Sequence, residues 1–266
     1  MADLQICLLG SFQVCWDFAP VAHGAWRDPL AARLLKAVLV LRPEPLPADL
    51  ASHWAGKEAY GARLVAALEA ANRVLHPGAS LQVEGGLIRF LPGPACWVDV
   101  DALAALQRSG AQALARGEIL KAVLALQEAD ALYQGDLLEE LQEPWVAEPR
   151  RRFQALYTEI LDQLAEGHAV LARYQDAVGF CHKALAHDPL REATYQRLMV
   201  YYFYLGDMPG VAEAYQRCVE ALAGVGRRIS PETADLWQHL SQQAPGSPAD
   251  MTAAARQEPP RLPRNR

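Results

Sequence analysis

Two stretches of the chain, ARYQDAVGFCHKAL at 172–185 and GDMPGVAEAYQRCV at 206–219, align with each other at a regular spacing. The matching positions are small or apolar, and they pair Leu171 with Leu205, Ala177 with Val211, and Ala184 with Cys218. Small side chains are needed where two helices of a stacked repeat approach closely. The register therefore predicts antiparallel helix pairs that repeat along the second half of the chain.

An earlier copy of this pattern lies at 116–133, RGEILKAVLALQEADALY, where Ala122 corresponds to Ala177. The distance in sequence from Ala122 to Ala177 is longer than that from Ala177 to Val211, and the excess is about the length of the segment 134–152. We therefore expect about three helix pairs, the first followed by an insertion, and a final helix near Pro231–Leu240. The spacing between the two later copies, about 34 residues, is that of the tetratricopeptide repeat.

The first 94 residues follow a different pattern, in which short strands flank a set of helices. Residues 4–18 are rich in Leu, Val, Phe and Cys and predict a β-hairpin or meander. Apolar periodicity predicts helices at 30–41, 48–54 and 59–75. Two predicted strands, Leu81–Val83 and Leu87–Phe90, flank a Glu-Gly-Gly turn. Strands, three helices and a hairpin, in this order, are typical of a winged helix-turn-helix of the response-regulator type.

The sequence thus predicts a mainly α protein with a small β component. We expect a winged-helix domain at 1–94, an all-α tetratricopeptide-like domain at 99–242, and a disordered tail at 243–266. The Pro-Gly-Pro at 92–94 marks the first boundary. The tail is rich in Pro, Ala, Ser and Arg and has too few apolar residues to build a core.

Charge is unevenly spread between these segments. Residues 1–98 hold eight Lys and Arg against eight Asp and Glu, whereas residues 99–242 hold 13 against 21. An acidic helical domain is not drawn to DNA. Any contact with nucleic acid is therefore expected from the neutral N-terminal domain.

Several function classes lack a signal in this sequence. The five cysteines are scattered without a C-x-x-C pair, which predicts reduced thiols and a cytoplasmic protein. His182 and His187 are five residues apart and fall on different helical faces, so no metal site is expected. Neither a membrane span nor a secretion signal is evident. We expect no cofactor and no catalytic constellation, because no nucleotide-binding or hydrolase motif is present.

Several stretches together resemble the bacterial transcriptional activators of the antibiotic-regulatory (SARP) type, over about residues 3–240. These proteins join an OmpR-like winged helix to a bacterial transcriptional activator domain (BTAD) of tetratricopeptide-like helices. The matching stretches are LQICLLGSFQV at 4–14, WRDPLAARLLKAVLVL at 26–41, WVDVDALAAL at 97–106, LYQGDLLEEL at 132–141, EPWVAEPRRRF at 143–153, ALAHDPLREATYQRLMVYYFYLGD at 184–207 and ISPETADLW at 229–237. The resemblance implies a transcription regulator whose recognition helix is the predicted helix 59–75.

Few residues of that helix are suited to bind DNA. If Leu64, Leu68, Ala71 and Leu75 face the core, the opposite face consists of Ala62, Arg63, Ala66, Ala67, Glu69, Ala70 and Arg73. Alanine can touch a thymine methyl but offers no hydrogen bond. The candidate DNA-binding residues are Arg63, Asn72, Arg73 and, in the wing, Arg89. An alternative interpretation is that Arg63 and Arg73 are merely solubilising charges on an exposed helix.

Other conspicuous residues have simpler interpretations. Arg150, Arg151 and Arg152 follow a run of glutamates, so we expect local charge pairing where they open a helix. Trp26, Trp54, Trp97 and Trp145 are expected to anchor cores, because large aromatic side chains are mostly packing residues.

The sequence supports two hypotheses for function. In the first, the protein is a transcription regulator that binds double-stranded DNA weakly, and its helical domain contacts a protein partner or forms a homodimer. In the second, the protein is an interaction module with a degenerate winged helix, and it acts through the acidic helical domain. Domain order favours the first hypothesis and net charge favours the second.

Overall fold

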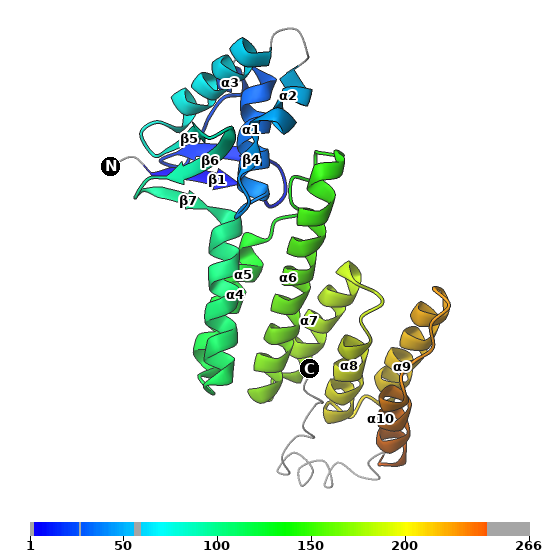
Figure 1. Cartoon of the computed structure of the whole chain (residues 1–266). Helices are drawn as coiled ribbons and strands as arrows, with labels where there is room; N and C mark the ends of the chain where they lie inside the picture. Colours follow the sequence, from blue (N-terminus) through cyan, green and yellow to red (C-terminus); the bar gives the residue numbers. More distant parts are fainter. Residues whose placement is uncertain (1–2, 27, 56–59, 244–266) are drawn as a thin grey trace. The chain divides into compact units, whose positions relative to one another are not determined.

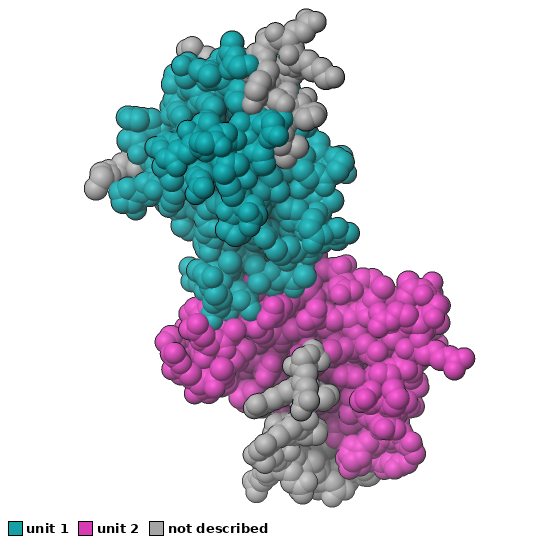
Figure 2. Space-filling view, viewed as in Figure 1, with its two compact units in different colours: residues 1–108, 128–157 teal, residues 109–127, 158–266 magenta. Residues whose placement is uncertain are grey.

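The structure is a computed structural model, and it describes residues 3–26, 28–55 and 60–243 (Figure 1). The chain divides into two compact units (Figure 2). Unit 1 comprises residues 1–108 and 128–157, and unit 2 comprises residues 109–127 and 158–266. These limits do not coincide with the predicted boundary at 94–99, so the division into domains at 1–94 and 99–242 stays a prediction. The predicted disordered tail lies, from residue 244 onward, outside the described residues.

Unit 1 begins with a four-stranded sheet. Its strands are β1 (Leu4–Cys7), β2 (Gln13–Trp16), β3 (Ala19–Pro20) and β7 (Cys96–Val98), in the order β3-β2-β1-β7. The meander β1-β2-β3 agrees with the prediction, but β7 was not foreseen. It pairs with β1 in parallel, Leu4 opposite Cys96, and so extends the sheet beyond the Pro-Gly-Pro at 92–94.

The middle of unit 1 is a winged helix-turn-helix, as predicted. A short 3₁₀ turn η1 (His23–Trp26) precedes three helices, α1 (Pro29–Val40), α2 (Ala48–Ala55) and α3 (Tyr60–Leu75). The strands are β4 (Leu46–Pro47), β5 (Ala79–Glu84) and β6 (Leu87–Pro92), in the order β4-β6-β5. The β5-β6 hairpin turns through Gly85 and Gly86, which both have positive φ, as a tight two-residue turn requires. Residue 59, the predicted start of the third helix, lies outside the described residues.

The remainder of unit 1 comes from helices predicted to belong to the second domain. The carboxylate of Asp99, at the start of α4 (Asp99–Ala115), accepts hydrogen bonds from the backbone N–H groups of Leu8 at 2.6 Å and Leu9 at 2.8 Å. Leu137 forms an antiparallel bridge with Leu9, and both leucines are buried. These contacts tie the N-terminal strands to segments far away in sequence, which local patterns cannot reveal.

The segment that follows α5 (Ile119–Leu132) is held by one arginine. Arg150 lies in α6 (Pro144–Val170) and donates to the backbone oxygens of Leu137, Leu138 and Leu141. The predicted charge pairing is therefore wrong for Arg150 and right for Arg151, which pairs with Glu148. The three arginines also do not open a helix, because α6 already begins at Pro144.

Unit 2 contains the helical repeat. Its remaining helices are α7 (Tyr174–His187), α8 (Glu192–Tyr204), α9 (Met208–Ala223) and α10 (Pro231–Gln242). Helices α7 and α9 begin at Tyr174 and Met208, which the sequence alignment places at equivalent positions, so the predicted register is confirmed. The predicted final helix is α10.

The same turn joins the helices of each pair. Gly117, Ala172 and Gly206 have positive φ, and they occupy equivalent positions of the three predicted copies. One residue further on, the N–H of Glu118, Arg173 and Asp207 reaches back five residues to a carbonyl oxygen, at 2.9 Å in each case. This is the Schellman closure of a helix C-terminus, and it directs the chain back along the preceding helix.

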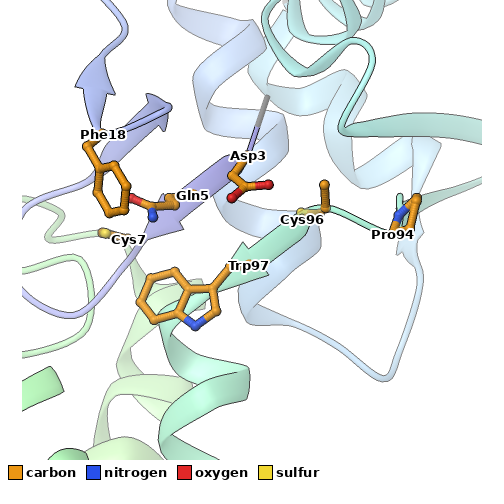
Figure 3. Close-up of a pocket in the computed structure, with 8 residues that line it drawn as sticks. Asp3, Gln5, Cys7, Phe18, Pro94, Cys96 and Trp97 are labelled. Atoms are coloured by element: carbon orange, nitrogen blue, oxygen red, sulfur yellow. The ribbon is translucent and has the colours of Figure 1, made fainter. Parts of the chain in front are cut away.

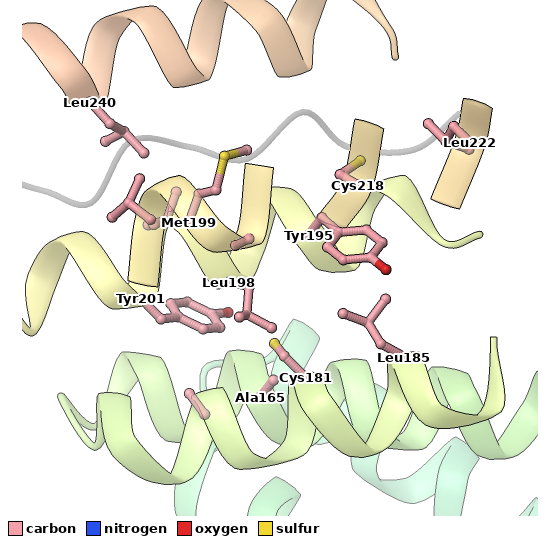
Figure 4. Packing of buried hydrophobic residues seen from close by; sticks show 14 residues of the cluster. Ala165, Cys181, Leu185, Tyr195, Leu198, Met199, Tyr201, Cys218, Leu222 and Leu240 are labelled. Atoms are coloured by element: carbon pink, nitrogen blue, oxygen red, sulfur yellow. The ribbon is translucent and has the colours of Figure 1, made fainter. Parts of the chain in front are cut away.

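The core of unit 2 is built by α7, α8, α9 and α10 together with the end of α6 (Figure 4). Ala177, Ala184, Val211 and Cys218 are fully buried, as the repeat predicted. Small residues at these positions allow the helices to approach closely, while Tyr195, Leu198 and Met199 of α8 fill the space between them.

Candidate nucleic-acid interface

The outward side of α3 is the surface that a winged helix presents to a DNA groove. Its exposed residues include Ala62, Arg63, Val65, Ala66, Glu69 and Arg73. Ala67 and Ala70 were expected on this side, but both are buried. The reason is that α1, α2 and β5 all pack on α3, so its buried side is wider than the leucine stripe alone.

Asn72 connects α3 to the wing. Its side-chain Nδ2 donates to the backbone oxygen of Leu81 at 3.0 Å, and its Oδ1 accepts from the backbone N–H of Leu81 at 2.6 Å. Both polar atoms of the amide are therefore engaged with β5. Asn72 fixes the angle between helix and hairpin, a positioning role that the sequence did not distinguish from base contact.

The three candidate arginines lie on different parts of the surface. Arg73 is near the end of α3 and Arg89 is on β6 of the wing, and both are exposed. Within the described residues, no carboxylate pairs with either of them. Arg63 lies nearer the start of α3, where its Nε is 3.9 Å from Asp28 Oδ2. Asp28 also caps α1 by accepting from the Leu30 N–H at 2.8 Å.

The cations of α1 are neutralised by carboxylates within unit 1. Arg33 pairs with Glu143 at 3.1 Å, and Lys36 pairs with Glu140 at 2.6 Å. Arg42, which follows α1, forms a bidentate pair with Asp101 at 2.9 and 3.0 Å. These pairs reduce the positive potential that the N-terminal part of the chain could offer to a phosphate backbone.

Two exposed valines were missed by the sequence reasoning. Val65 on α3 is 54 % exposed, and Val83 on β5 of the wing is 47 % exposed. Helical periodicity gave the signal for Val65, because it lies three residues after Ala62 and away from the leucine stripe. Apolar side chains thus make up much of the surface that would face DNA.

A second surface feature of unit 1 is a hollow on the outer face of the N-terminal sheet (Figure 3). Trp97 lines it and is 37 % exposed, so its expected role as a core anchor is wrong. Phe18 and Cys7 also line the hollow. Burial and the nearby charge of Asp99 raise the pKa of Cys7 to about 11, so this thiol is protonated at neutral pH and is a poor nucleophile.

The motifs behind the family resemblance form structural contacts. In the D-P-L-R-E element, Arg191 pairs with the buried carboxylate of Asp162 at 2.6 Å. In the Y-x-G-D element, Tyr133 donates to Asp136 at 2.9 Å, and its ring stacks on Tyr157 with 3.7 Å between centroids. These contacts hold the helices together.

The described residues give no sign of a metal site or a membrane span. No group of three or more His, Cys, Asp or Glu side chains is placed to hold a metal ion within that part of the chain. None of its helices is both long and apolar enough to cross a bilayer.

Residues 98–240 match the bacterial transcriptional activator domain, which is more than half of the chain. The chain belongs to the bacterial transcriptional activator domain family. The BTAD match begins at Val98, the last residue of β7, and ends at Leu240, so it spans α4 to α9 and most of α10. No curated protein matches the sequence.

Among solved structures, this BTAD protein is similar to Mycobacterium tuberculosis EmbR in complex with a low-affinity phosphopeptide. The two share 21 % identity with a TM-score of 0.80, over 96 % of this chain and 70 % of the EmbR chain. Two tetratricopeptide domains align with lower scores. One, from a Plasmodium falciparum FK506-binding protein, has 14 % identity and a TM-score of 0.43, over 59 % of this chain and 93 % of that one. The other, Sgt2 from Aspergillus fumigatus, has 20 % identity and a TM-score of 0.39, over 59 % and 85 %.

Proposed function

We propose that this protein is a non-catalytic transcription regulator that binds double-stranded DNA through its winged helix. Helix α3 would enter the major groove, and the β5-β6 hairpin would lie along the adjacent minor groove. The observation that carries the proposal is the Asn72 clamp, which fixes an exposed helix to an exposed wing in one geometry. Such a regulator would act in the cytoplasm, where bacterial promoters are.

DNA binding is expected to be weak, because few cations are available among the residues of the winged helix that the structure describes. Arg63, Arg73 and Arg89 would contact phosphates or base edges, whereas the cations of α1 are already paired. With about three phosphate contacts, the slope of log affinity against log salt is expected near −3. Fluorescence anisotropy of a labelled duplex at several salt concentrations measures this slope. A slope steeper than about −7 would place the binding face elsewhere.

Alanine variants test the assignment of the interface. Arg73→Ala and Arg89→Ala should each weaken binding by about 1–3 kcal/mol if the arginine reads a base, and less if it touches only a phosphate. Arg151→Ala is the matched control, since Arg151 is exposed in α6 and pairs only with exposed Glu148 among the described residues. A triple variant of Arg63, Arg73 and Arg89 that binds as tightly as the wild type would refute the assignment.

The helical domain would contact a protein partner or mediate homodimerisation. Residues 99–242 carry an excess of eight acidic residues, which favours a basic or neutral partner surface over DNA. If the full chain shows no binding to any duplex in a randomised pool, the protein would act through this helical domain alone. The neutralised cations of α1 favour that second hypothesis.

A further inference from the structure

The side of α3 that faces outward carries methyl groups where a polar contact surface would be expected. Ala62, Val65 and Ala66 are spaced by three and four residues and therefore share one side of the helix. All three are exposed, and Val65 exposes more than half of its surface. Because Val65 leaves more than half of its surface outside the core of unit 1, its apolar side chain is available for a contact with a ligand.

The major groove offers one apolar feature, the C5-methyl group of thymine. The other base-edge groups in that groove are hydrogen-bond donors and acceptors, which alanine and valine cannot satisfy. Resting on the proposed function, we propose that Ala62, Val65 and Ala66 recognise the operator by packing on thymine methyl groups. Sequence specificity then comes from apolar contacts, and the arginines contribute mainly to affinity.

Glu69 fits the same scheme. It lies three residues after Ala66, on the same side of α3, and is exposed. A carboxylate only accepts hydrogen bonds, and in the major groove its donors are the amino groups of cytosine and adenine. Guanine presents two acceptors there and is disfavoured. The site that faces α3 is therefore expected to have thymines next to a cytosine or an adenine, and no guanine at the position that Glu69 contacts.

The flanking charges agree with this orientation. Arg63 lies at one edge of the methyl surface beside Asp28, and Arg73 lies one helical turn beyond Glu69. In this orientation the two guanidinium groups would contact phosphates at the edges of the groove. Phosphate contacts of this kind orient the helix but carry no sequence information.

The experiment begins with selection of duplexes from a randomised pool by the full chain. Each thymine of the selected site is then replaced by deoxyuridine, which removes the C5-methyl group and leaves every hydrogen-bonding group in place. Loss of one buried methyl contact should raise Kd about four-fold at each contacted position. Positions outside the α3 footprint should show no change.

Protein variants locate the contact. Val65→Ala should bring the Kd ratio between uracil and thymine from about four down to near one at a single position, because the packing surface is lost. Val170→Ala is the matched control, since Val170 is 57 % exposed on α6 in the helical domain. Circular dichroism confirms that both variants keep the fold.

The possible results separate this inference from the proposed function. A selected site that binds equally well with thymine or uracil at every position overturns methyl recognition and leaves DNA binding intact. A discrimination that Val65→Ala does not change would show that the methyl groups are read by other residues, which also overturns the inference. Failure to enrich any duplex overturns the proposed function and the inference together.

Discussion

Replacement of Arg150 by alanine should destabilise unit 1 far more than replacement of its neighbour. Arg150 donates to three backbone oxygens of the segment between α5 and α6, at 2.9 Å to Leu137, 2.6 Å to Leu138 and 2.8 Å to Leu141. Leu137 and Leu138 have fully buried side chains, and Leu138 has a φ of 48°. A leucine adopts this left-handed backbone only where surrounding contacts hold it.

The magnitude follows from these three hydrogen bonds. A hydrogen bond to a charged group contributes about 1.5–3 kcal/mol net, and the guanidinium makes three of them. Arg150 is half-buried, so water can satisfy some of the carbonyl oxygens once the side chain is removed. We expect Arg150→Ala to lower the free energy of unfolding by about 3 kcal/mol. Arg150→Lys keeps the charge but lacks the planar fork, so about half of that loss should remain.

Urea denaturation followed by circular dichroism measures the effect, with Arg151→Ala as the control. Arg151 is exposed and pairs only with exposed Glu148 among the described residues, so its removal should change the free energy by less than about 0.5 kcal/mol. If the two alanine variants unfold at the same urea concentration, Arg150 is not what holds the segment between α5 and α6.

Three further predictions concern the repeat, the junction at Asp99 and the domain boundary. Ala172 has the left-handed backbone that Gly117 and Gly206 adopt in the equivalent turns. Ala172→Gly should therefore raise the free energy of unfolding by about 0.5–1 kcal/mol. An unchanged or lower melting temperature would contradict this. Burial raises the pKa of Asp99 to about 6 despite three backbone N–H donors, so its stabilising contribution is complete below about pH 4 and is lost as pH rises through 6. The stability of the wild type relative to Asp99→Asn should fall by about 2 kcal/mol between pH 4 and pH 7, and a difference that is constant with pH would refute this. A fragment of residues 99–242 should melt cooperatively as a helical unit, at a lower temperature than the full chain because it lacks the hydrogen bonds to Leu8 and Leu9. Removal of residues 243–266 from the full chain should leave the melting temperature unchanged. A 99–242 fragment with little helix would show that the two domains share one core.

The local patterns of the sequence were sufficient for most secondary structure. The repeat register aligned the segments in which α7 and α9 begin, because helix positions follow from the apolar period of the nearby residues. The wing was equally predictable, since two glycines between apolar strands allow the positive φ of a tight turn. The resemblance to an activator family rested on motifs whose order and spacing can be read directly from the linear sequence.

The candidate interface was only partly predictable. The sequence pointed to α3 and its arginines as candidates, but it did not reveal that the Asn72 amide is hydrogen-bonded to Leu81 or that Val65 is exposed. Whether an amide is free or engaged depends on its distance from Leu81 across the turn between helix and wing. Whether Ala67 and Ala70 are exposed depends on how many neighbours pack on α3, which one helical wheel does not reveal.

Long-range pairing was decided only in the tertiary structure. Strand β7 joins β1 although the whole winged helix lies between them in sequence, and Asp99 and Leu137 complete unit 1 from segments that the sequence assigns to the next domain. The helices of the repeat and of the winged helix follow from the spacing of apolar residues, which is a property of the sequence itself. Pairings such as Arg33 with Glu143 depend on which surfaces meet after folding. The identities of two residues far apart in the sequence do not reveal that they form an ion pair.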